Sequence, residues 1–263
     1  MSNRPNAPPA HSLGQKTFAL DGREVDLLHY IHSRPDIKQL RGSPQKVVSA
    51  IDEYHTKFNP LINVGSVKGA FVTNLIAERK PSVMIELGGY VGYSAILFGD
   101  AIRANGGKRF LSIEKNPEAA AVANQLVDLA GLRDTVRVLV GASDEVLREL
   151  VGDRKEIAQV EMIFIDHWQK LYQPDLWLLE ELDVLVPGKS VLLADNVIMP
   201  GAPEYLEWVQ ATTRQKRELV KKLDVGSLTP NPNLVYETSV SEFDTDFGKD
   251  GIAVTRVVGK ESV

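Results

Sequence analysis

Residues Val83 to Ser94 read VMIELGGYVGYS, an apolar run followed by a loop that contains three glycines. The run predicts a buried strand, and Gly88, Gly89 and Gly92 predict a tight turn into a helix. In an open parallel sheet such a turn lies at the carboxyl edge of the strands, where it cradles a nucleotide cofactor. The glycines do not have the G-x-G-x-x-G spacing that receives a dinucleotide pyrophosphate, which disfavours an NAD-linked oxidoreductase.

Similar short runs recur along the chain and predict further strands, at Arg109–Glu114, Val136–Val140, Met162–Asp166 and Ser190–Ala194. Helical stretches separate these runs, which is the βαβ pattern of a parallel α/β sheet with helices on both faces. Right-handed crossovers then bring every strand's carboxyl end to one edge. Two last runs, at 233–240 and 252–258, have an acidic loop but no helix between them, and they predict an antiparallel pair that closes the sheet.

The part of the chain before this pattern divides into a tail and a set of helices. Residues 1–22 are rich in Pro, Asn, Ser and Gly without periodicity and predict a flexible tail, so that 23–263 forms a single domain. Helical spacing puts Val25, Leu28 and Ile31 on one buried face. A second helix is predicted after Ser43, with Ser43 as its N-cap and Pro44 at its first position.

Composition narrows the class of protein. The 263 residues carry a net charge of -5 with acidic and basic residues well mixed, so no basic stripe predicts a nucleic-acid partner. No apolar run approaches the roughly 20 residues that span a bilayer, and the start lacks a secretory signal, so we expect a cytoplasmic protein without a membrane partner. Cysteine is absent, which excludes disulfides, thiolate metal sites and cysteine nucleophiles.

Polar residues lie at the carboxyl ends of the two predicted strands that follow the glycine loop. Glu114 ends one strand, where it can accept hydrogen bonds from ribose hydroxyls. The segment Gly141-Ala142-Ser143-Asp144 follows the next strand, where it can bond an adenine amine. Taken singly, each feature is also typical of an ordinary turn or of a solvated strand end. Their order on three successive strands predicts an adenosine ligand without a pyrophosphate.

Two later strands end on metal-binding side chains. Residues 164–168 read FIDHW and residues 192–196 read LLADN, so Asp166 and the pair Asp195 and Asn196 come at strand ends. Hard oxygen ligands on neighbouring strands suit Mg²⁺, whereas His167 is not expected to bind it because Mg²⁺ disfavours imidazole. The alternatives are that Asp166 caps the next helix and that Asp195 and Asn196 only begin a turn.

Together with Pro200-Gly201-Ala202-Pro203, these segments occur in an order and at intervals that resemble catechol O-methyltransferase, a Mg²⁺-dependent family that uses S-adenosylmethionine. The resemblance runs from about Val25 to Gly259. It implies a Rossmann-like class I methyltransferase fold, with N-terminal helices and a seven-stranded, mostly parallel sheet whose last two strands form an antiparallel hairpin.

The resemblance also implies the roles of particular residues. Around the donor these are Val64, Glu86, Gly88, Tyr90 and Ser94 at the methionine part, Glu114 at the ribose, and Ser143, Asp144, His167 and Trp168 near the adenine, with Asp166 beside them. Asp166, Asp195 and Asn196 would bind Mg²⁺ and leave positions open for two neighbouring oxygens of an aromatic diol. Metal binding would lower the pKa of one hydroxyl, which could then attack the sulfonium methyl.

The chain departs from the family at the acceptor side. The family has a lysine directly after Asp-His-Trp as general base, whereas this chain has Gln169 there and Lys170 one position later. Three alternatives follow. Lys170 replaces the family's lysine as general base, the bound metal alone activates the hydroxyl, or a bound water accepts its proton. Substrate contacts are expected from Asn196 and Pro200, and from Glu242 for the second hydroxyl, or Ser241 if the alignment shifts by one.

The sequence thus predicts S-adenosylmethionine- and Mg²⁺-dependent O-methylation of a catechol or related vicinal aromatic diol. The family has a tryptophan at the position of Pro60, so one wall of the acceptor slot is expected to be more open. That opening favours an alternative, a methyltransferase of the same fold for bulkier phenolics such as hydroxycinnamoyl esters. Gln169 suggests another, a catalytically weak protein that binds S-adenosylmethionine.

Overall fold

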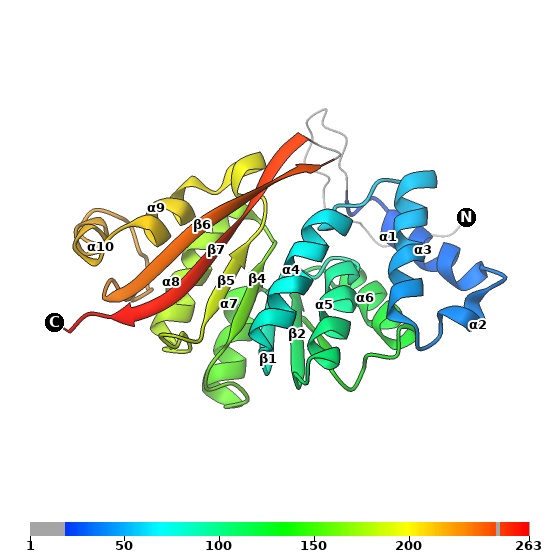
Figure 1. Cartoon of the computed structure of the whole chain (residues 1–263), viewed down its shortest axis with the longest axis horizontal. Helices are drawn as coiled ribbons and strands as arrows, with labels where there is room; N and C mark the ends of the chain where they lie inside the picture. Colours follow the sequence, from blue (N-terminus) through cyan, green and yellow to red (C-terminus); the bar gives the residue numbers. More distant parts are fainter. Residues whose placement is uncertain (1–18, 246–247, 263) are drawn as a thin grey trace, which may run out of the picture.

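The structure is a computed structural model that describes residues 19–245 and 248–262, and seven strands of it form one sheet (Figure 1). The strands are β1 Val83–Leu87, β2 Arg109–Glu114, β3 Val136–Val140, β4 Met162–Ile165, β5 Val191–Ala194, β6 Leu234–Thr245 and β7 Gly248–Lys260. Their order is β3-β2-β1-β4-β5-β7-β6. The first five strands are parallel, and β7 is antiparallel to both β5 and β6. The predicted fold class is confirmed.

The helices are α1 Arg23–Ser33, α2 Ile37–Leu40, α3 Pro44–Lys57, α4 Gly65–Arg79, α5 Tyr93–Ala104, α6 Pro117–Leu129, α7 Ser143–Arg148, α8 Tyr172–Glu181, α9 Pro203–Gln210 and α10 Thr213–Val220. Local signals set several helix starts. Asn116 accepts hydrogen bonds from two backbone N–H groups at the start of α6, and Thr212 forms a capping box with Gln215 before α10. Pro44 does begin α3, although the Ser43 side chain makes no capping hydrogen bond.

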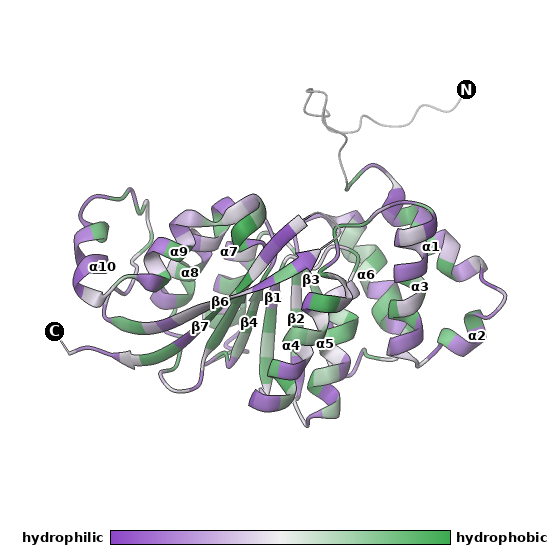
Figure 2. Ribbon diagram, turned by 45° about the horizontal axis from the view of Figure 1, so that its top comes forward, coloured by the Kyte–Doolittle hydropathy of each residue, from purple (hydrophilic) through white to green (hydrophobic). Residues whose placement is uncertain are grey.

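The core lies on both faces of the sheet, because neighbouring residues of a strand point to opposite sides. Phe110 and Phe164 pack with α3 to α6 on one face, while Leu111 and Ile163 pack with α7 to α9 on the other. Figure 2 shows the central strands as mainly hydrophobic and α10 as mainly hydrophilic. The order of strands reverses between β1 and β4, which is the point where open α/β sheets bind their ligands.

The buried face of α1 is shifted by one residue from the predicted face at two of its three positions. Its fully buried side chains are Glu24, Leu27 and Ile31, whereas Val25 and Leu28 are only partly buried. The prediction was wrong because it assigned no charged residue to the core. Glu24 is buried there because the hydroxyl of Tyr90, in the glycine loop, donates a hydrogen bond to its carboxylate at 2.6 Å. The predicted tail lies mostly outside the described residues, which begin at 19.

The C-terminal hairpin is longer than predicted. Residues on both sides of the expected acidic loop are paired, as Phe243 with Asp250 and Asp244 with Lys249. β5 pairs only with residues 253–256 of β7, so this end of the hairpin extends beyond the sheet as a two-stranded ribbon. The buried positions of this ribbon include the charged residue Asp250 as well as Ile252, so its sequence lacks the apolar alternation of an ordinary strand and is typical of a loop. Among the described residues, no helix is long and apolar enough to cross a membrane.

Candidate active site

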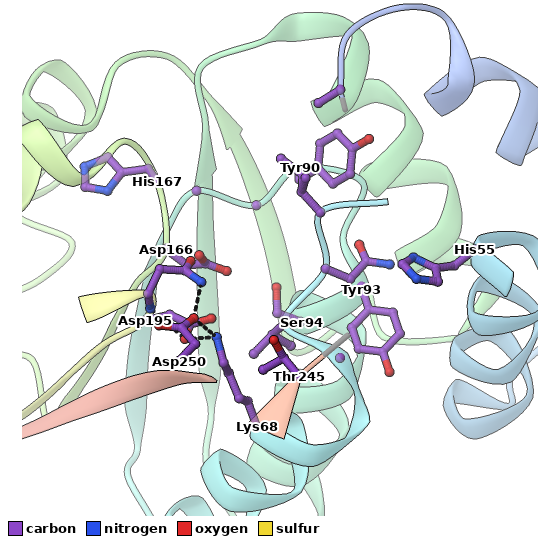
Figure 3. Close-up of a pocket in the computed structure, with 18 of the residues that line it drawn as sticks. His55, Lys68, Tyr90, Tyr93, Ser94, Asp166, His167, Asp195, Thr245 and Asp250 are labelled. Carbon is purple, nitrogen blue, oxygen red and sulfur yellow. Dashed lines mark hydrogen bonds and ion pairs between the residues drawn. The ribbon is translucent and has the colours of Figure 1, made fainter. Parts of the chain in front are cut away.

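A cavity of about 1050 Å³ opens at the carboxyl ends of β1, β4 and β5 (Figure 3). That volume accommodates a nucleoside-sized molecule together with a small second substrate. The predicted site residues that line it are Val64, Gly88, Tyr90, Ser94, Glu114, Asp166, His167, Trp168, Gln169, Asp195, Asn196 and Pro200. The lining does not include Glu86, Ser143, Asp144, Lys170 or Glu242. The topology thus brings together most residues that the sequence analysis selected.

The glycine loop after β1 packs directly against the end of β4. Gly88 has a φ of 96°, and a Cβ added to it would lie 2.3 Å from the backbone oxygen of Asp166. A side chain at this position would therefore be strained and would collide with the neighbouring strand. The absence of a side chain lets the two strand ends approach and leaves the loop backbone facing the cavity.

The turn also orients Glu114. The backbone N–H of Tyr90 donates to Glu114 Oε2 at 2.8 Å, and that of Asn116 donates to Oε1 at 2.6 Å. Each oxygen keeps a free lone pair, since a carboxylate has about four acceptor positions. Glu114 lines the cavity, so these lone pairs are available to hydroxyl groups of a bound ribose.

Glu86 lies beneath the loop rather than in the cavity wall. It is fully buried, and the hydroxyl of Ser112 donates to its Oε2. Burial raises the pKa of Glu86 to about 7, although the hydrogen bonds of Ser112 and Ser94 oppose this. Its Oε1 has no hydrogen-bond partner among the described residues. A buried acceptor without a donor beside the loop fits a site that receives a donor from a bound molecule.

A buried carboxylate joins two of the four residues that were predicted near the adenine. Ser143 Oγ donates to Asp175 Oδ2 at 2.6 Å, and His167 Nε2 lies 2.6 Å from the same oxygen. The His167 ring also stacks on Tyr172, with centroids 5.3 Å apart. Asp175 therefore fixes the orientation of His167 at the cavity wall. Asp144, in contrast, lies on α7 outside the cavity lining.

The predicted metal ligands meet at the ends of β4 and β5. Asp166 and Asp195 are both in buried surroundings, and desolvation, followed by the negative charge of Asp195, raises the pKa of Asp166 well above its usual value. A divalent cation between them would relieve this cost. With the Asn196 amide, the set consists of hard oxygen donors, as Mg²⁺ requires. This set contains only two carboxylates, and among residues 19–245 and 248–262 no group of three His, Cys, Asp or Glu side chains is arranged to hold a metal ion.

Two charged residues that the sequence analysis missed complete this corner. Lys68 on α4 is only 4 % exposed, and its ammonium donates to Asp195 Oδ1 and Asp250 Oδ2, both at 2.6 Å. Burial would lower the pKa of Lys68, but the two carboxylates outweigh this effect and raise it. The sequence feature that could have indicated the burial of Lys68 is its position, since it lies four and eight residues before the buried Val72 and Ile76 on the same helix face.

The acceptor side differs from two predictions. Lys170 lies in a short 3₁₀ turn, is exposed and does not line the cavity, whereas Gln169 does. Glu242 does not line the cavity either, and its carboxylate lies 4.0 Å from the ammonium of Lys249. Instead, Asp244 from the end of β6 lines the cavity, because the hairpin continues beyond Glu242 as a strand.

The mouth of the cavity has an exposed apolar rim. Trp168 is 70 % exposed, Ile62 52 % and Met199 45 %, and all three line the cavity. Pro60 is also exposed, two residues before Ile62. Large apolar side chains with this exposure at a cavity mouth mark a binding surface for a hydrophobic ligand.

The strand order, the reversed hairpin and the loop after β1 define a class I methyltransferase fold. A family model described as O-methyltransferase matches residues 46–227. The chain therefore belongs to the O-methyltransferase family, and the resemblance predicted from its motifs is confirmed.

Curated relatives include catechol O-methyltransferases. The bovine (Bos taurus) enzyme is 44 % identical over 173 residues, which are 66 % of this chain and 62 % of the bovine protein. The mouse (Mus musculus) enzyme is 39 % identical over 193 residues, 73 % of this chain and 69 % of that protein. The chain thus spans somewhat less than two thirds of the bovine relative.

Among solved structures, the O-methyltransferase TomG from Streptomyces achromogenes, in complex with S-adenosylmethionine, superposes with a TM-score of 0.60 at 24 % identity. The match covers 81 % of this chain and 90 % of TomG. At this identity the likeness establishes the fold alone.

Proposed function

We propose that this protein transfers the methyl group of S-adenosylmethionine to one hydroxyl of a catechol or related vicinal aromatic diol, with Mg²⁺ bound at Asp166, Asp195 and Asn196. One observation carries the proposal: the oxygen ligands at the ends of β4 and β5 and the glycine loop after β1 open into the same cavity. Methyl donor and metal-held acceptor would therefore meet without any large movement of the chain.

The donor would lie along the edge of β1, β2 and β4. Gly88 would admit it close to the backbone, the two oriented oxygens of Glu114 would accept from the ribose hydroxyls, and His167, held by Asp175, would lie beside the adenine. Glu86 does not line the cavity, but its Oε1, which has no partner among the described residues, would accept a hydrogen bond from the ammonium of the methionine part once the donor is bound. Each of these contacts orients the donor before reaction, which is how a methyl transfer gains most from its protein.

The acceptor would enter through the apolar rim. Bound Mg²⁺ would supply a Lewis acid that holds two neighbouring hydroxyls and lowers the pKa of one of them. Ile62, Trp168 and Pro200 would flank the aromatic ring, and Asp244, in place of Glu242, would accept a hydrogen bond from the second hydroxyl. An isolated phenol lacks that second contact, so the site selects a vicinal diol.

The hydroxyl proton would leave to water at the open mouth of the cavity. Gln169 cannot accept a proton, and Lys170 does not reach the cavity. Lys68, although it lines the cavity, is held as an ammonium by two carboxylates and cannot act as a base. We therefore assign neither Lys68 nor Lys170 as general base.

The test is methylation of 3,4-dihydroxybenzoate by the full chain, with and without Mg²⁺, with the two monomethyl products resolved by chromatography. 4-Hydroxybenzoate serves as the matched acceptor with one hydroxyl, and Asp195→Ala as the matched enzyme variant. We expect product only from the diol, only with Mg²⁺ and only with the wild-type chain. Equal turnover of both acceptors, or turnover that survives chelation, would refute the proposal.

Bulkier phenolics are the second candidate acceptors, because Ile62 and Met199 at the rim are exposed and the small Pro60 stands where the family has a tryptophan. A catechol and a hydroxycinnamoyl ester with the same ring substitution distinguish the two by their kcat/KM. A catalytically weak binding protein would instead show calorimetric binding of S-adenosylmethionine and no product with either acceptor.

A further inference from the structure

Asp250 has every acceptor position of its carboxylate in use. Oδ1 accepts hydrogen bonds from the backbone N–H groups of Met199 at 3.0 Å and Gly251 at 2.7 Å. Oδ2 accepts from Lys68 Nζ and Asn196 Nδ2, both at 2.6 Å. The carboxylate therefore has no lone pair left for a metal ion, although it lines the same cavity.

Lys68 and Asp250 between them determine which atoms of the neighbouring residues remain free. Oδ1 of Asp195 accepts from Lys68 Nζ and from the backbone N–H of Asn196, at 2.6 and 2.8 Å. The NH₂ group of Asn196 donates to Asp250. Oδ2 of Asp195 and Oδ1 of Asn196 are the remaining acceptors, and an oxygen is the only end of an amide that can bind a cation.

We propose that Lys68 and Asp250 are positioning residues for the metal site: they hold the Asp195 carboxylate and the Asn196 amide with one oxygen each directed to the cation. This inference rests on the proposed function, because it assigns a role toward the metal that the proposed reaction requires. Hydrogen bonds of this kind to metal-ligating side chains orient the ligands and commonly change metal affinity by about 10- to 100-fold.

The pair links three separate parts of the fold. Lys68 comes from α4, Asp195 from the end of β5, and Asp250 from the part of β7 that extends beyond the sheet. Figure 3 shows the Lys68 side chain reaching toward both aspartates. The ribbon end of the hairpin thus has a role at the metal corner, through Asp250, in addition to its role at the acceptor, through Asp244.

A rival interpretation is that Lys68 is only a counter-ion, which offsets the buried carboxylates and competes with the metal. The two interpretations differ in sign. Loss of a competing ammonium would strengthen metal binding, whereas loss of a positioning contact would weaken it.

The Asp250→Asn variant, compared with a control that loses the same charge, separates the effect of ligand orientation on metal binding from the effect of a lost negative charge. The amide introduced by this substitution would turn its NH₂ group toward Asn196, so the Asn196 amide would flip and present its own NH₂ to the cation. Asp52→Asn is the matched control, because Asp52 lines the same cavity and the same negative charge is removed, but Asp52 is hydrogen-bonded to Tyr93 rather than to a metal ligand.

The experiment titrates the wild-type chain and the variants with Mn²⁺ and measures the free ion by electron paramagnetic resonance, with S-adenosylmethionine affinity measured by calorimetry in the absence of metal. We expect Asp250→Asn and Lys68→Met to weaken Mn²⁺ binding about 10- to 100-fold. Asp52→Asn should change it less than about threefold, and donor affinity should stay within about twofold throughout, since Asp52 shares no hydrogen-bond partner with the metal ligands and none of the three residues is among the proposed donor contacts.

Each outcome decides one claim. Equal effects of Asp250→Asn and Asp52→Asn, or tighter Mn²⁺ binding in Lys68→Met, would overturn the positioning role. Failure of the wild-type chain to bind Mn²⁺ would overturn the proposed metal site itself. If Lys68→Met fails to fold, as its melting curve would show, Asp250→Asn alone decides, because it keeps Lys68 and a side chain of the same size at position 250 while removing the acceptor that orients Asn196.

Discussion

Gly88→Ala tests the close approach of the cofactor loop to β4. The new Cβ would lie 2.3 Å from the backbone oxygen of Asp166, about 1 Å inside ordinary van der Waals contact. A residue with a Cβ at this positive φ costs roughly 1–2 kcal/mol, and forced overpacking costs a further 1–3 kcal/mol or so. We therefore expect the free energy of unfolding to fall by about 2–5 kcal/mol.

Gly106→Ala is the matched control. Gly106 also has a positive φ, of 82°, but a Cβ there would have no heavy atom within 4 Å. Only the backbone term remains, so we expect a loss of about 1–2 kcal/mol. Urea denaturation of both variants gives the two values, and their difference isolates the contact with Asp166.

The functional consequence separates the two variants further. The shift needed to relieve the contact displaces Asp166, a predicted metal ligand, and a 1 Å misplacement can lower a rate by about 100-fold. Gly88→Ala should therefore lose donor affinity and turnover, while Gly106→Ala keeps both. Equal destabilisation by the two substitutions, or full activity of Gly88→Ala, would refute this account of the loop.

Three further predictions concern single side chains. Lys170→Ala should change kcat less than about twofold, because Lys170 lies outside the cavity; a large drop near neutral pH would restore it as general base. Asp244→Asn should raise the KM for a catechol roughly tenfold, whereas Glu242→Gln should leave it unchanged, and the reverse result would return that role to Glu242. Burial lowers the pKa of Lys216 to about 8. Between this pKa and the higher pKa of an unfolded lysine, the unfolded chain binds more protons than the folded chain. The free energy of unfolding should therefore rise by about 2 kcal/mol from pH 8 to 10. Lys216→Met should lose this rise in urea titrations, and an unchanged slope would contradict it.

The corner at Lys68 shows where sequence reasoning stopped. A lysine in register with Val72 and Ile76 is unusual for a buried helix face, but nothing nearby in sequence indicates its partners. Asp195 and Asp250 lie 127 and 182 residues away along the chain. Only the β5–β7 pairing brings both carboxylates to α4.

The residues that line the acceptor side differ from the predicted ones for a similar reason. Glu242 and Asp244 point to the same side of β6, and both are acidic, so local pattern does not distinguish them. The length of the hairpin does, because it decides which residue reaches the cavity mouth. Whether Lys170 reaches the cavity could likewise be decided only by the structure, since an offset of one residue along a helical turn points a side chain in another direction.

The sequence by itself determined the parallel sheet, the antiparallel closing pair, the glycine loop and the position of Asp166, Asp195 and Asn196, the predicted metal ligands, at strand ends. These features follow from local rules, namely apolar periodicity, glycine geometry and the position of polar residues at strand ends. Tertiary structure alone decided the Lys68 and Asp250 contacts, and that Asp244, but neither Glu242 nor Lys170, lines the cavity. Their positions depend on strand pairing and on the direction of side chains across the cavity, and those are set by burial and packing of segments far apart in the chain.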